Sequence, residues 1–251
     1  MLTKRIIACM DIADGRVKKG TNFKNLRDAG DPVELGKLYS KSGIDELIFL
    51  DVMATVENRN TLLKLVSRVA KKINIPFAIG GGVKTIEDIR NLLNAGADKV
   101  SIGSTAVTNP DFINEASKEF GSQCIIISVD PKKEGGSWKI YIKGGRERTN
   151  LDAIEFCKDM ERRGAGELLV NSLDRDGTKE GYDIELLKAI NKVTNLPVIA
   201  SSGAGKKEDF LEVFKKTNTS AALSASLFHY KKLVIQDLKK YLANNNVNIR
   251  L

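Results

Sequence analysis

The strongest constraint on the fold is a regular alternation, along the whole chain, of short apolar runs with amphipathic helical segments. Each apolar run is bounded by Gly, Asp or Pro, as is typical of strands buried in a parallel sheet. The expected strands are 6–12, 46–52, 77–81, 100–103, 124–130, 167–173, 198–201 and 221–224. The expected helices are 32–42, 61–73, 86–95, 110–120, 152–163, 184–193, 207–216 and 233–243. Helical crossovers force parallel strands, so the 251 residues predict one domain (1–251), an α/β fold of the (β/α)8 (TIM) barrel type.

The chain also repeats itself at an offset of roughly half its length. Residues 75–82 (IPFAIGGG) reappear as 196–203 (LPVIASSG), and 43–47 (GIDEL) reappear as 164–168 (GAGEL). The apolar run that ends at Asp11 has its counterpart in the run that ends at Asp130. Chance similarity among β/α units could explain one such match. It explains three matches at the same offset poorly, which favours a true internal repeat. The repeat predicts two half-barrels, about 1–121 and 122–251, and a site of approximate two-fold symmetry.

Two acidic residues end expected strands on the side where barrels of this type carry their chemistry. Asp11 ends the first strand and Asp130 the fifth, so we expect them to face each other across the mouth of the barrel. Two carboxylates held apart on a rigid frame can act as general acid and general base on one substrate. The alternative is local: Asp11 would cap the turn at Asp14-Gly15, and Asp130 precedes Pro131, a common turn start.

Glycine-rich segments follow the third and seventh expected strands, and small residues follow their neighbours. These segments are Gly80-Gly81-Gly82, 201–205, Gly103-Ser104 and Ala225-Ser226. Glycine there lets phosphate oxygens approach backbone N–H groups and the start of the following helix. Two such sites on opposite sides of the mouth predict a ligand with a phosphate at each end, although the glycines could simply form tight turns. Residues 174–178 (DRDGT) could bind substrate hydroxyls or form an ordinary Asp-Gly turn.

Composition argues against several other classes of protein. The net charge is +8, but acids and bases are interleaved, so we expect neither nucleic-acid binding nor a membrane partner. No run approaches the roughly 20 apolar residues of a membrane span, and the start leaves no room for a signal peptide. Cys9, Cys124 and Cys157 lack metal-ligand spacing, which indicates reduced thiols in a cytoplasmic protein. With His229 as the single histidine, we expect no metal and no catalytic triad.

Several segments together are far more specific than a generic barrel. They are 4–11 (KRIIACMD), 14–17 (DGRV), 30–33 (GDPV), 96–102 (GADKVSI), 163–167 (RGAGE), 174–178 (DRDGT) and 247–250 (VNIR). In these segments the chain resembles, over essentially its whole length, the cyclase subunits of imidazole glycerol phosphate synthase in histidine biosynthesis. The resemblance implies a heterodimer with a glutaminase subunit, HisH, and a lyase reaction without a cofactor. Ammonia would condense with a bisphosphorylated ribulosyl aminoimidazole carboxamide nucleotide to give imidazole glycerol phosphate and the carboxamide ribotide.

The resemblance also assigns individual residues. Asp11 and Asp130 match the acid/base pair, and Lys19 matches a first-loop lysine that covers the substrate. Phosphate contacts map to Gly82, Gly103 and Ser104 on one side, and to Asp176, Gly177, Gly203, Ala225 and Ser226 on the other. A charge ring that admits ammonia at the bottom of the barrel maps to Arg5, Glu46, Lys99 and Glu167. Asp98 matches a position that faces the glutaminase. Charges at strand starts could instead be ordinary solvent-facing ion pairs.

Several positions depart from the family pattern, and three of those near the mouth are Gly103, where Asn is usual, Met53, where Thr is usual, and Ser202, where Gly is usual. Two alternative functions therefore remain open. One is a cyclase-like paralogue that delivers ammonia for amidation of surface-glycan sugars, and the other is a non-catalytic phosphate-binding scaffold. Such paralogues tend to lose the first-strand aspartate, and a scaffold needs neither the acid pair nor the charge ring. The residues present therefore favour the synthase cyclase.

Overall fold

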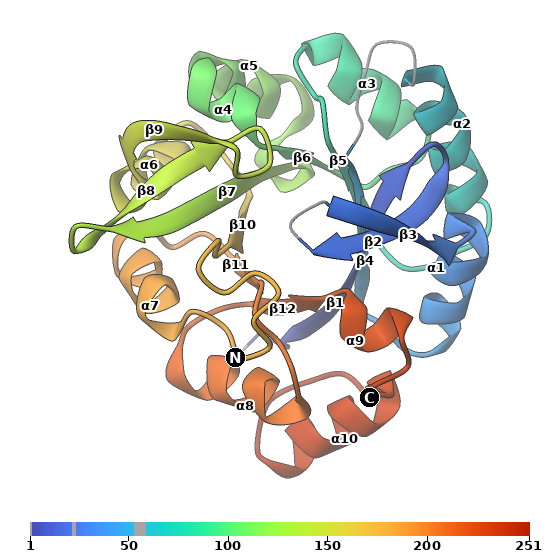
Figure 1. Cartoon of the computed structure of the whole chain (residues 1–251). Coiled ribbons are helices and arrows are strands. Elements are labelled where there is room, and N and C mark those ends of the chain that lie inside the picture. Colours follow the sequence, from blue (N-terminus) through green and yellow to red (C-terminus); the bar gives the residue numbers. More distant parts are fainter. Residues whose placement is uncertain (1, 22–23, 53–58) are drawn as a thin grey trace.

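The computed structural model describes residues 2–21, 24–52 and 59–251, and within them a parallel barrel is surrounded by helices (Figure 1). The barrel strands are β1 (Arg5–Ala13), β4 (Glu46–Asp51), β5 (Phe77–Gly80), β6 (Lys99–Ile102), β7 (Ile125–Glu134), β10 (Glu167–Asn171), β11 (Val198–Ser201) and β12 (Ala221–Ser224). Parallel pairing follows that order, and β12 pairs with β1, so the sheet closes. The predicted (β/α)8 barrel is confirmed.

Each expected helix has a counterpart on the outside of the barrel. These helices are α1 (Pro32–Lys41), α2 (Arg59–Ala70), α3 (Ile86–Asn94), α5 (Asp111–Phe120), α6 (Ala153–Arg162), α7 (Ile184–Val193), α8 (Lys207–Lys216) and α10 (Ile235–Asn244). Some of their starts carry side-chain caps: Asp31 accepts hydrogen bonds from the first turn of α1, and Thr85 forms a capping box with Asp88 at α3. Three short elements were not predicted, namely α4 (Ser104–Thr108), α9 (Ser226–His229) and the 3-10 turn η1 (Ser122–Cys124).

Two antiparallel hairpins extend from the mouth and were also not predicted (Figure 1). Their strands are β2 (Arg16–Thr21) with β3 (Lys24–Gly30), and β8 (Ser137–Ile142) with β9 (Glu147–Asp152). The end of β1 pairs with β2 and the end of β7 pairs with β8, so both barrel strands continue beyond the aspartates. Asp130 is therefore not the last residue of its strand, and the interpretation of Pro131 as a turn start is wrong. Pro131 lies inside β7, opposite Ile140.

Alternation along the strands divides the core into two layers. One layer packs between strands and helices, while a second cluster fills the barrel interior and includes Ile7, Ile48, Ile126 and Leu169. Because side chains alternate along a strand, residues that share the parity of Ile7 also face inward. Arg5 and Asp11 have this parity on β1, so the apolar interior separates a charged bottom from an acidic mouth.

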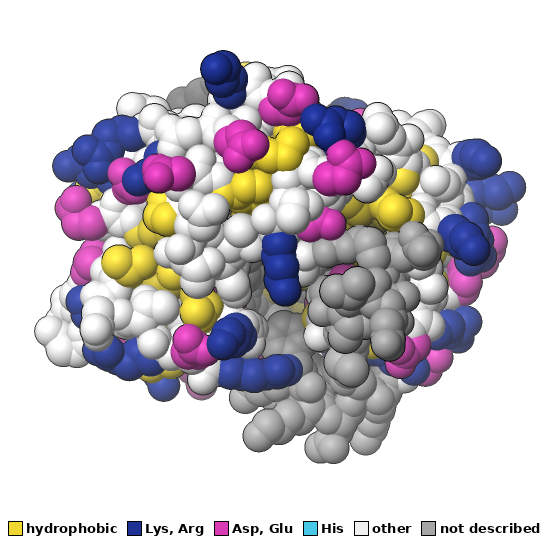
Figure 2. Space-filling model, turned by 90° about the horizontal axis from the view of Figure 1, so that it is seen from above, with side chains coloured by type: hydrophobic (Ala, Val, Ile, Leu, Met, Phe, Trp, Pro, Cys, Tyr) yellow, Lys and Arg dark blue, Asp and Glu magenta, His cyan; other side chains and the backbone are white. Residues whose placement is uncertain are grey.

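The outer surface carries charges of both signs. On the face seen in Figure 2, lysine and arginine side chains are interspersed with acidic ones. Among the described helices, none is long and apolar enough to cross a membrane. On this face the described lysine and arginine side chains are thus not gathered into one basic patch.

Candidate active site

Asp11 lies near the mouth of the barrel on β1 and is held between two neighbouring strands. Its backbone pairs with Leu50 of β4 and with Lys18 of β2. The side chain is only 6% exposed, and the thiol of Cys9 lies 3.9 Å from its Oδ1. The backbone that carries this carboxyl group is thereby fixed by the barrel.

Asp130 occupies the corresponding place on β7 and has a different environment. Its Oδ1 accepts a hydrogen bond of 2.9 Å from Nδ2 of Asn171, on the adjacent strand β10. Burial raises the pKa of Asp130 to about 6, against the opposing effect of the Asn171 hydrogen bond and with a smaller contribution from the nearby Asp176 carboxylate. A carboxyl group that titrates near neutrality can both accept and release protons under physiological conditions.

The two aspartates come from opposite sides of the barrel. Going round the sheet from β1, three strands (β4, β5 and β6) precede β7, and three more (β10, β11 and β12) lead back to β1. Both side chains belong to the inward-facing set near the carboxyl ends of their strands. A ligand between them would have one acidic group on each side, as the sequence predicted.

The glycines after β5 and β11 are required by the backbone. A Cβ at Gly81 would lie 2.2 Å from the carbonyl oxygen of Asp51, and one at Gly203 would lie 2.2 Å from that of Gly181. Both residues also have positive φ, as does Gly82 at 64°. These tight turns keep side chains away from the mouth on two opposite sides.

Two of the departures from the family pattern have different structural consequences. At Gly103 an added Cβ would make only ordinary contacts, 3.8 Å from Ser128, so this position has room for a side chain. Ser202 has a φ of 74°, in the left-handed region that favours glycine. The third departure, Met53, lies outside the described residues.

The other expected phosphate contacts lie around the same mouth. Gly103 and Ser104 begin α4, and Ala225 and Ser226 begin α9. The hydroxyl oxygen of Ser104 already accepts a 3.0 Å hydrogen bond from the backbone N–H of Lys143, between β8 and β9.

The last of the expected ligand contacts lie on two separate segments. Asp176 and Gly177 are exposed in the loop after β10, where Thr178 donates to the carbonyl oxygen of Arg175, so a turn forms there. Lys19 lies on β2, opposite Arg27 of β3, and its side chain is outside the described part of the chain.

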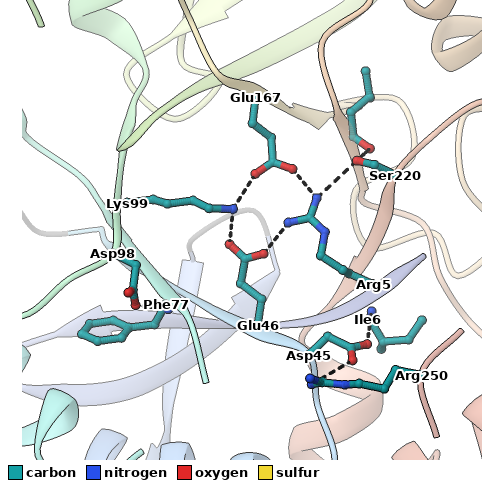
Figure 3. Close-up of polar contacts among 11 residues, drawn as sticks. Arg5, Ile6, Asp45, Glu46, Phe77, Asp98, Lys99, Glu167, Ser220 and Arg250 are labelled. Carbon is teal, nitrogen blue, oxygen red and sulfur yellow. Dashed lines mark hydrogen bonds and ion pairs between the residues drawn. The ribbon is translucent and has the colours of Figure 1, made fainter. Parts of the chain in front are cut away.

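The charge ring lies at the opposite end of the barrel, where four strands begin. Figure 3 shows the side chains of Arg5, Glu46, Lys99 and Glu167 converging from β1, β4, β6 and β10. Lys99 Nζ lies 2.8 Å from Glu46 and 2.9 Å from Glu167, while Arg5 lies 2.5 Å from Glu46 and also pairs with Glu167. Each cation thus binds both carboxylates, and the four groups close a continuous ring.

The carboxylates of the charge ring are shielded from solvent. The side chains of Glu46 and Glu167 are only 2% and 6% exposed, so the interpretation of these charges as solvent-facing pairs is wrong. Burial alone would lower the pKa of Lys99, but the adjacent Glu46 and Glu167 carboxylates outweigh it and raise that pKa. The same balance raises the pKa of Arg5, so both cations stay charged.

Two further aspartates lie beside the charge ring (Figure 3). Asp98 precedes Lys99, is exposed, and accepts a 2.9 Å hydrogen bond from the backbone N–H of Phe77. Asp45 precedes Glu46 and accepts from the backbone N–H of Ile6 at 2.8 Å. It also pairs with Lys239 of α10 at 2.7 Å, and both side chains of this pair are buried.

Sequence reasoning did not single out Asn171, Ser128, Asp45 or Lys239. The signal for Asn171 was present, because an amide side chain ends an apolar run on the strand beside Asp130. For Lys239 there was no signal, since a lysine in an amphipathic helix is normally solvent-exposed. His229 is hydrogen-bonded to the hydroxyl of Tyr39 at 2.6 Å, in keeping with a structural role. Across the described ranges, no three His, Cys, Asp or Glu side chains are grouped to hold a metal ion.

Comparison with known proteins agrees with this geometry. Residues 5–234 match the family model described as histidine biosynthesis protein. The chain is 57% identical to the imidazole glycerol phosphate synthase subunit HisF of Hydrogenobaculum sp. (strain Y04AAS1), over all of both chains. It is 54% identical to the HisF subunit of Cytophaga hutchinsonii, again over all of both chains, and 53% identical to that of Prochlorococcus marinus (strain MIT 9215), over all of this chain and 99% of the other. The chain therefore belongs to the HisF family, the cyclase subunits of imidazole glycerol phosphate synthase in histidine biosynthesis.

Proposed function

We propose that Asp11 and Asp130 are the acid/base pair of the cyclase reaction, in which ammonia and the ribulosyl aminoimidazole carboxamide nucleotide give imidazole glycerol phosphate and the carboxamide ribotide. The observation that carries the proposal is their placement on opposite barrel strands, both facing inward at the mouth. Neither depends on a loop for its position, so the spacing between them is set by the barrel.

The reaction requires proton transfers that such a pair can perform. Ammonia adds to a ketone, water leaves, and a ring closes while a C–N bond breaks, so protons must be removed at one point and delivered at another. A pKa near 6 allows Asp130 to serve in either protonation state near neutral pH. Asp11, on the opposite strand, provides a second carboxyl group so that donor and acceptor can act on two sides of one substrate.

The phosphates of the substrate are proposed to bind at two rims of the mouth. The first rim comprises Gly82, Gly103 and Ser104, and the second comprises Asp176, Gly177, Gly203, Ala225 and Ser226. Support comes from the placement of the first rim after β5 and β6 and most of the second after β11 and β12, on opposite sides of the barrel. Backbone N–H groups at such turns attract anions. Lys19, on the hairpin next to β1, is proposed to cover the bound substrate.

As a HisF subunit, the chain works in a synthase with a partner subunit. We propose that this partner is a glutaminase, HisH, that it forms a heterodimer at the bottom of the barrel, and that ammonia enters through the charge ring. The supporting feature is that ring's position below the apolar interior, on the same axis as the mouth. Asp98, exposed next to Lys99, is proposed to contact the partner.

A cytoplasmic location is proposed as well. The thiols of Cys9 and Cys157 are buried, and burial raises the pKa of Cys157 to about 12, which keeps it protonated and unreactive. Such reduced thiols are typical of cytoplasmic proteins.

The proposed function is tested by turnover of the ribulosyl nucleotide with the purified chain and an ammonium salt. We expect substrate absorbance to fall and the two products to appear in equal amounts, without added metal. If the nucleotide bound but was not converted at any ammonium concentration, the proposed reaction would be wrong for this chain.

A further inference from the structure

We propose that Asn171 is a positioning residue for Asp130: its side-chain amide fixes the orientation of that carboxyl group and favours its ionised form. The inference rests on the proposed function of Asp130 in proton transfer. It assigns to Asn171 an effect exerted through Asp130, with no contact to the substrate required.

The geometry leaves the amide little freedom. Val170 of β10 pairs with Val129 of β7, which brings the next residues, Asn171 and Asp130, side by side. Nδ2 of Asn171 donates to Asp130 Oδ1 at 2.9 Å and to Ser128 Oγ at 3.0 Å. A side-chain amide nitrogen carries two hydrogens, so both are used. The bond to Ser128 therefore holds the amide plane while the other hydrogen holds Asp130.

The strand position beside Asp11 that corresponds to Asn171 holds a different kind of side chain. The residue opposite Asp11 on β4 is Leu50, whose side chain is apolar and packs against the interior cluster. Leu50 lies on β4 and Asn171 on β10, and three barrel strands separate these two on either side. The two halves of the mouth thus differ at this strand position, which holds an amide beside Asp130 and an apolar side chain beside Asp11.

The donor also changes the chemistry of the carboxyl group. A hydrogen bond from an amide favours the ionised form of an acid, whereas burial favours the neutral form. At Asp130 burial dominates, and the Asn171 bond opposes it, leaving the pKa at about 6. Removing the donor should therefore raise the pKa of Asp130 further and turn its carboxyl group away from its present orientation.

The test compares two variants of nearly identical shape, Asn171→Thr and Asn171→Val. Threonine keeps a hydroxyl donor on the strand, whereas valine has none. The ammonium-driven reaction is measured from pH 5 to pH 9, with melting temperatures recorded for both variants. For Asn171→Val we expect the pH limb assigned to Asp130 to move upward by about one unit, with KM changed by less than about twofold. Asn171→Thr should keep that limb within about 0.3 units of the wild type.

Several outcomes would overturn the inference. Identical pH profiles for both variants and the wild type would show that the amide has no influence on Asp130. Equal losses in both variants, with raised KM and lowered melting temperature, would show that Asn171 only supports the fold. If Asn171→Val does not fold, Asn171→Ser and Asn171→Ala give the same donor comparison at smaller volume.

Asp130→Asn separates this inference from the proposed function. If wild-type turnover is present and is lost in Asp130→Asn, but Asn171→Val behaves like the wild type, only the role of Asn171 fails. If Asp130→Asn retains turnover, the proposed function of Asp130 fails. Carboxyl ¹³C titration of Asp130 in the free protein checks the hydrogen bond without reference to activity, and an unchanged titration in Asn171→Val would contradict it.

Discussion

The raised pKa of Asp130 suits a group proposed to transfer protons, but the same burial that raises it lowers the stability of the fold when the carboxyl group is ionised. In the fold its pKa is about 6, compared with an ordinary value of 3.8, because burial disfavours the ionised form. A group whose pKa is raised in the folded state binds protons more tightly there than in the unfolded chain. The protein should therefore lose stability as the pH rises from about 4 through about 6, and the ionised group should destabilise it above that range.

This predicts that Asp130→Asn stabilises the protein near neutral pH. A difference of about two pK units corresponds to roughly 2–3 kcal/mol, so we expect an increase of that order in the free energy of unfolding at pH 7.5. The increase should fall to less than about 1 kcal/mol near pH 4, where the aspartate is protonated in the fold and about half protonated in the unfolded chain. Urea unfolding at both pH values measures this, with the exposed Asp111→Asn as control. A variant no more stable than the wild type at pH 7.5 would contradict the buried, ionised state.

For individual residues, the sequence predicted the strand on which a side chain lies better than it predicted the hydrogen bonds that the side chain makes. The apolar runs placed Asp11 and Asp130 on opposite strands, because strand order follows from the repeated β/α unit. The Asn171 bond depends on the register between β7 and β10, which a single sequence does not show. Likewise, the left-handed conformation of Ser202 is set by the loop around it rather than by the serine itself.

The charge ring depends on four barrel strands that each begin with a charged residue pointing inward. Its carboxylates are almost fully buried. Removal of one cation would leave part of their negative charge without a positive partner. Removing one partner of a buried ion pair generally lowers the free energy of unfolding much more than removing one partner of an exposed pair.

We therefore expect Lys99→Met to lower the free energy of unfolding by roughly 2–4 kcal/mol, since Arg5 still compensates part of the carboxylate charge. Lys216→Met is the matched control, because Lys216 pairs with Glu212 at 2.6 Å on the surface of α8. That change should cost less than about 1 kcal/mol. Chemical unfolding of the two variants under identical conditions makes the comparison. If the two variants lost similar free energies of unfolding, burial of the charge ring would make no extra contribution to stability.

Three of the four hairpin strands missed from the sequence, β2, β3 and β9, are rich in polar residues. β9 is largely exposed, and β2 contains Arg, Lys and Thr, so neither produces an apolar run. β8 alternates strictly between buried and half-buried residues and follows Gly135-Gly136, a common hairpin turn. That signal was available. The barrel strands were found because both of their faces are buried.

Across the described part of the molecule, charged groups gather at the two ends of one barrel, and we propose that function is divided between these ends. The mouth carries the aspartates, the bottom carries the charge ring, and the interior between them is apolar. We propose that this arrangement comes from two half-barrels, about 1–121 and 122–251. Asp11 and Asp130 lie on the opposed strands β1 and β7, while Glu46 and Glu167 open the opposed strands β4 and β10.

If ammonia passes through the barrel from the charge ring to the mouth, a change in the ring should affect the two sources of ammonia differently. Lys99→Met should reduce turnover driven by glutamine and a glutaminase subunit several-fold more than turnover driven by added ammonium, because ammonium salt can reach the mouth from solvent. Lys216→Met should change neither rate. Rates are compared at a temperature where all variants are folded. Equal reductions in the two assays would remove the case for passage through the charge ring.

The central claim, that Asp11 and Asp130 perform the proton transfers, is tested most directly by the ammonium-driven kcat of Asp11→Asn and Asp130→Asn at pH 7.5. Each variant is predicted to lose at least about 10²-fold in kcat, with the barrel still folded and the substrate still bound. If either variant kept kcat within about twofold of the wild type, general acid/base catalysis by this pair would be contradicted.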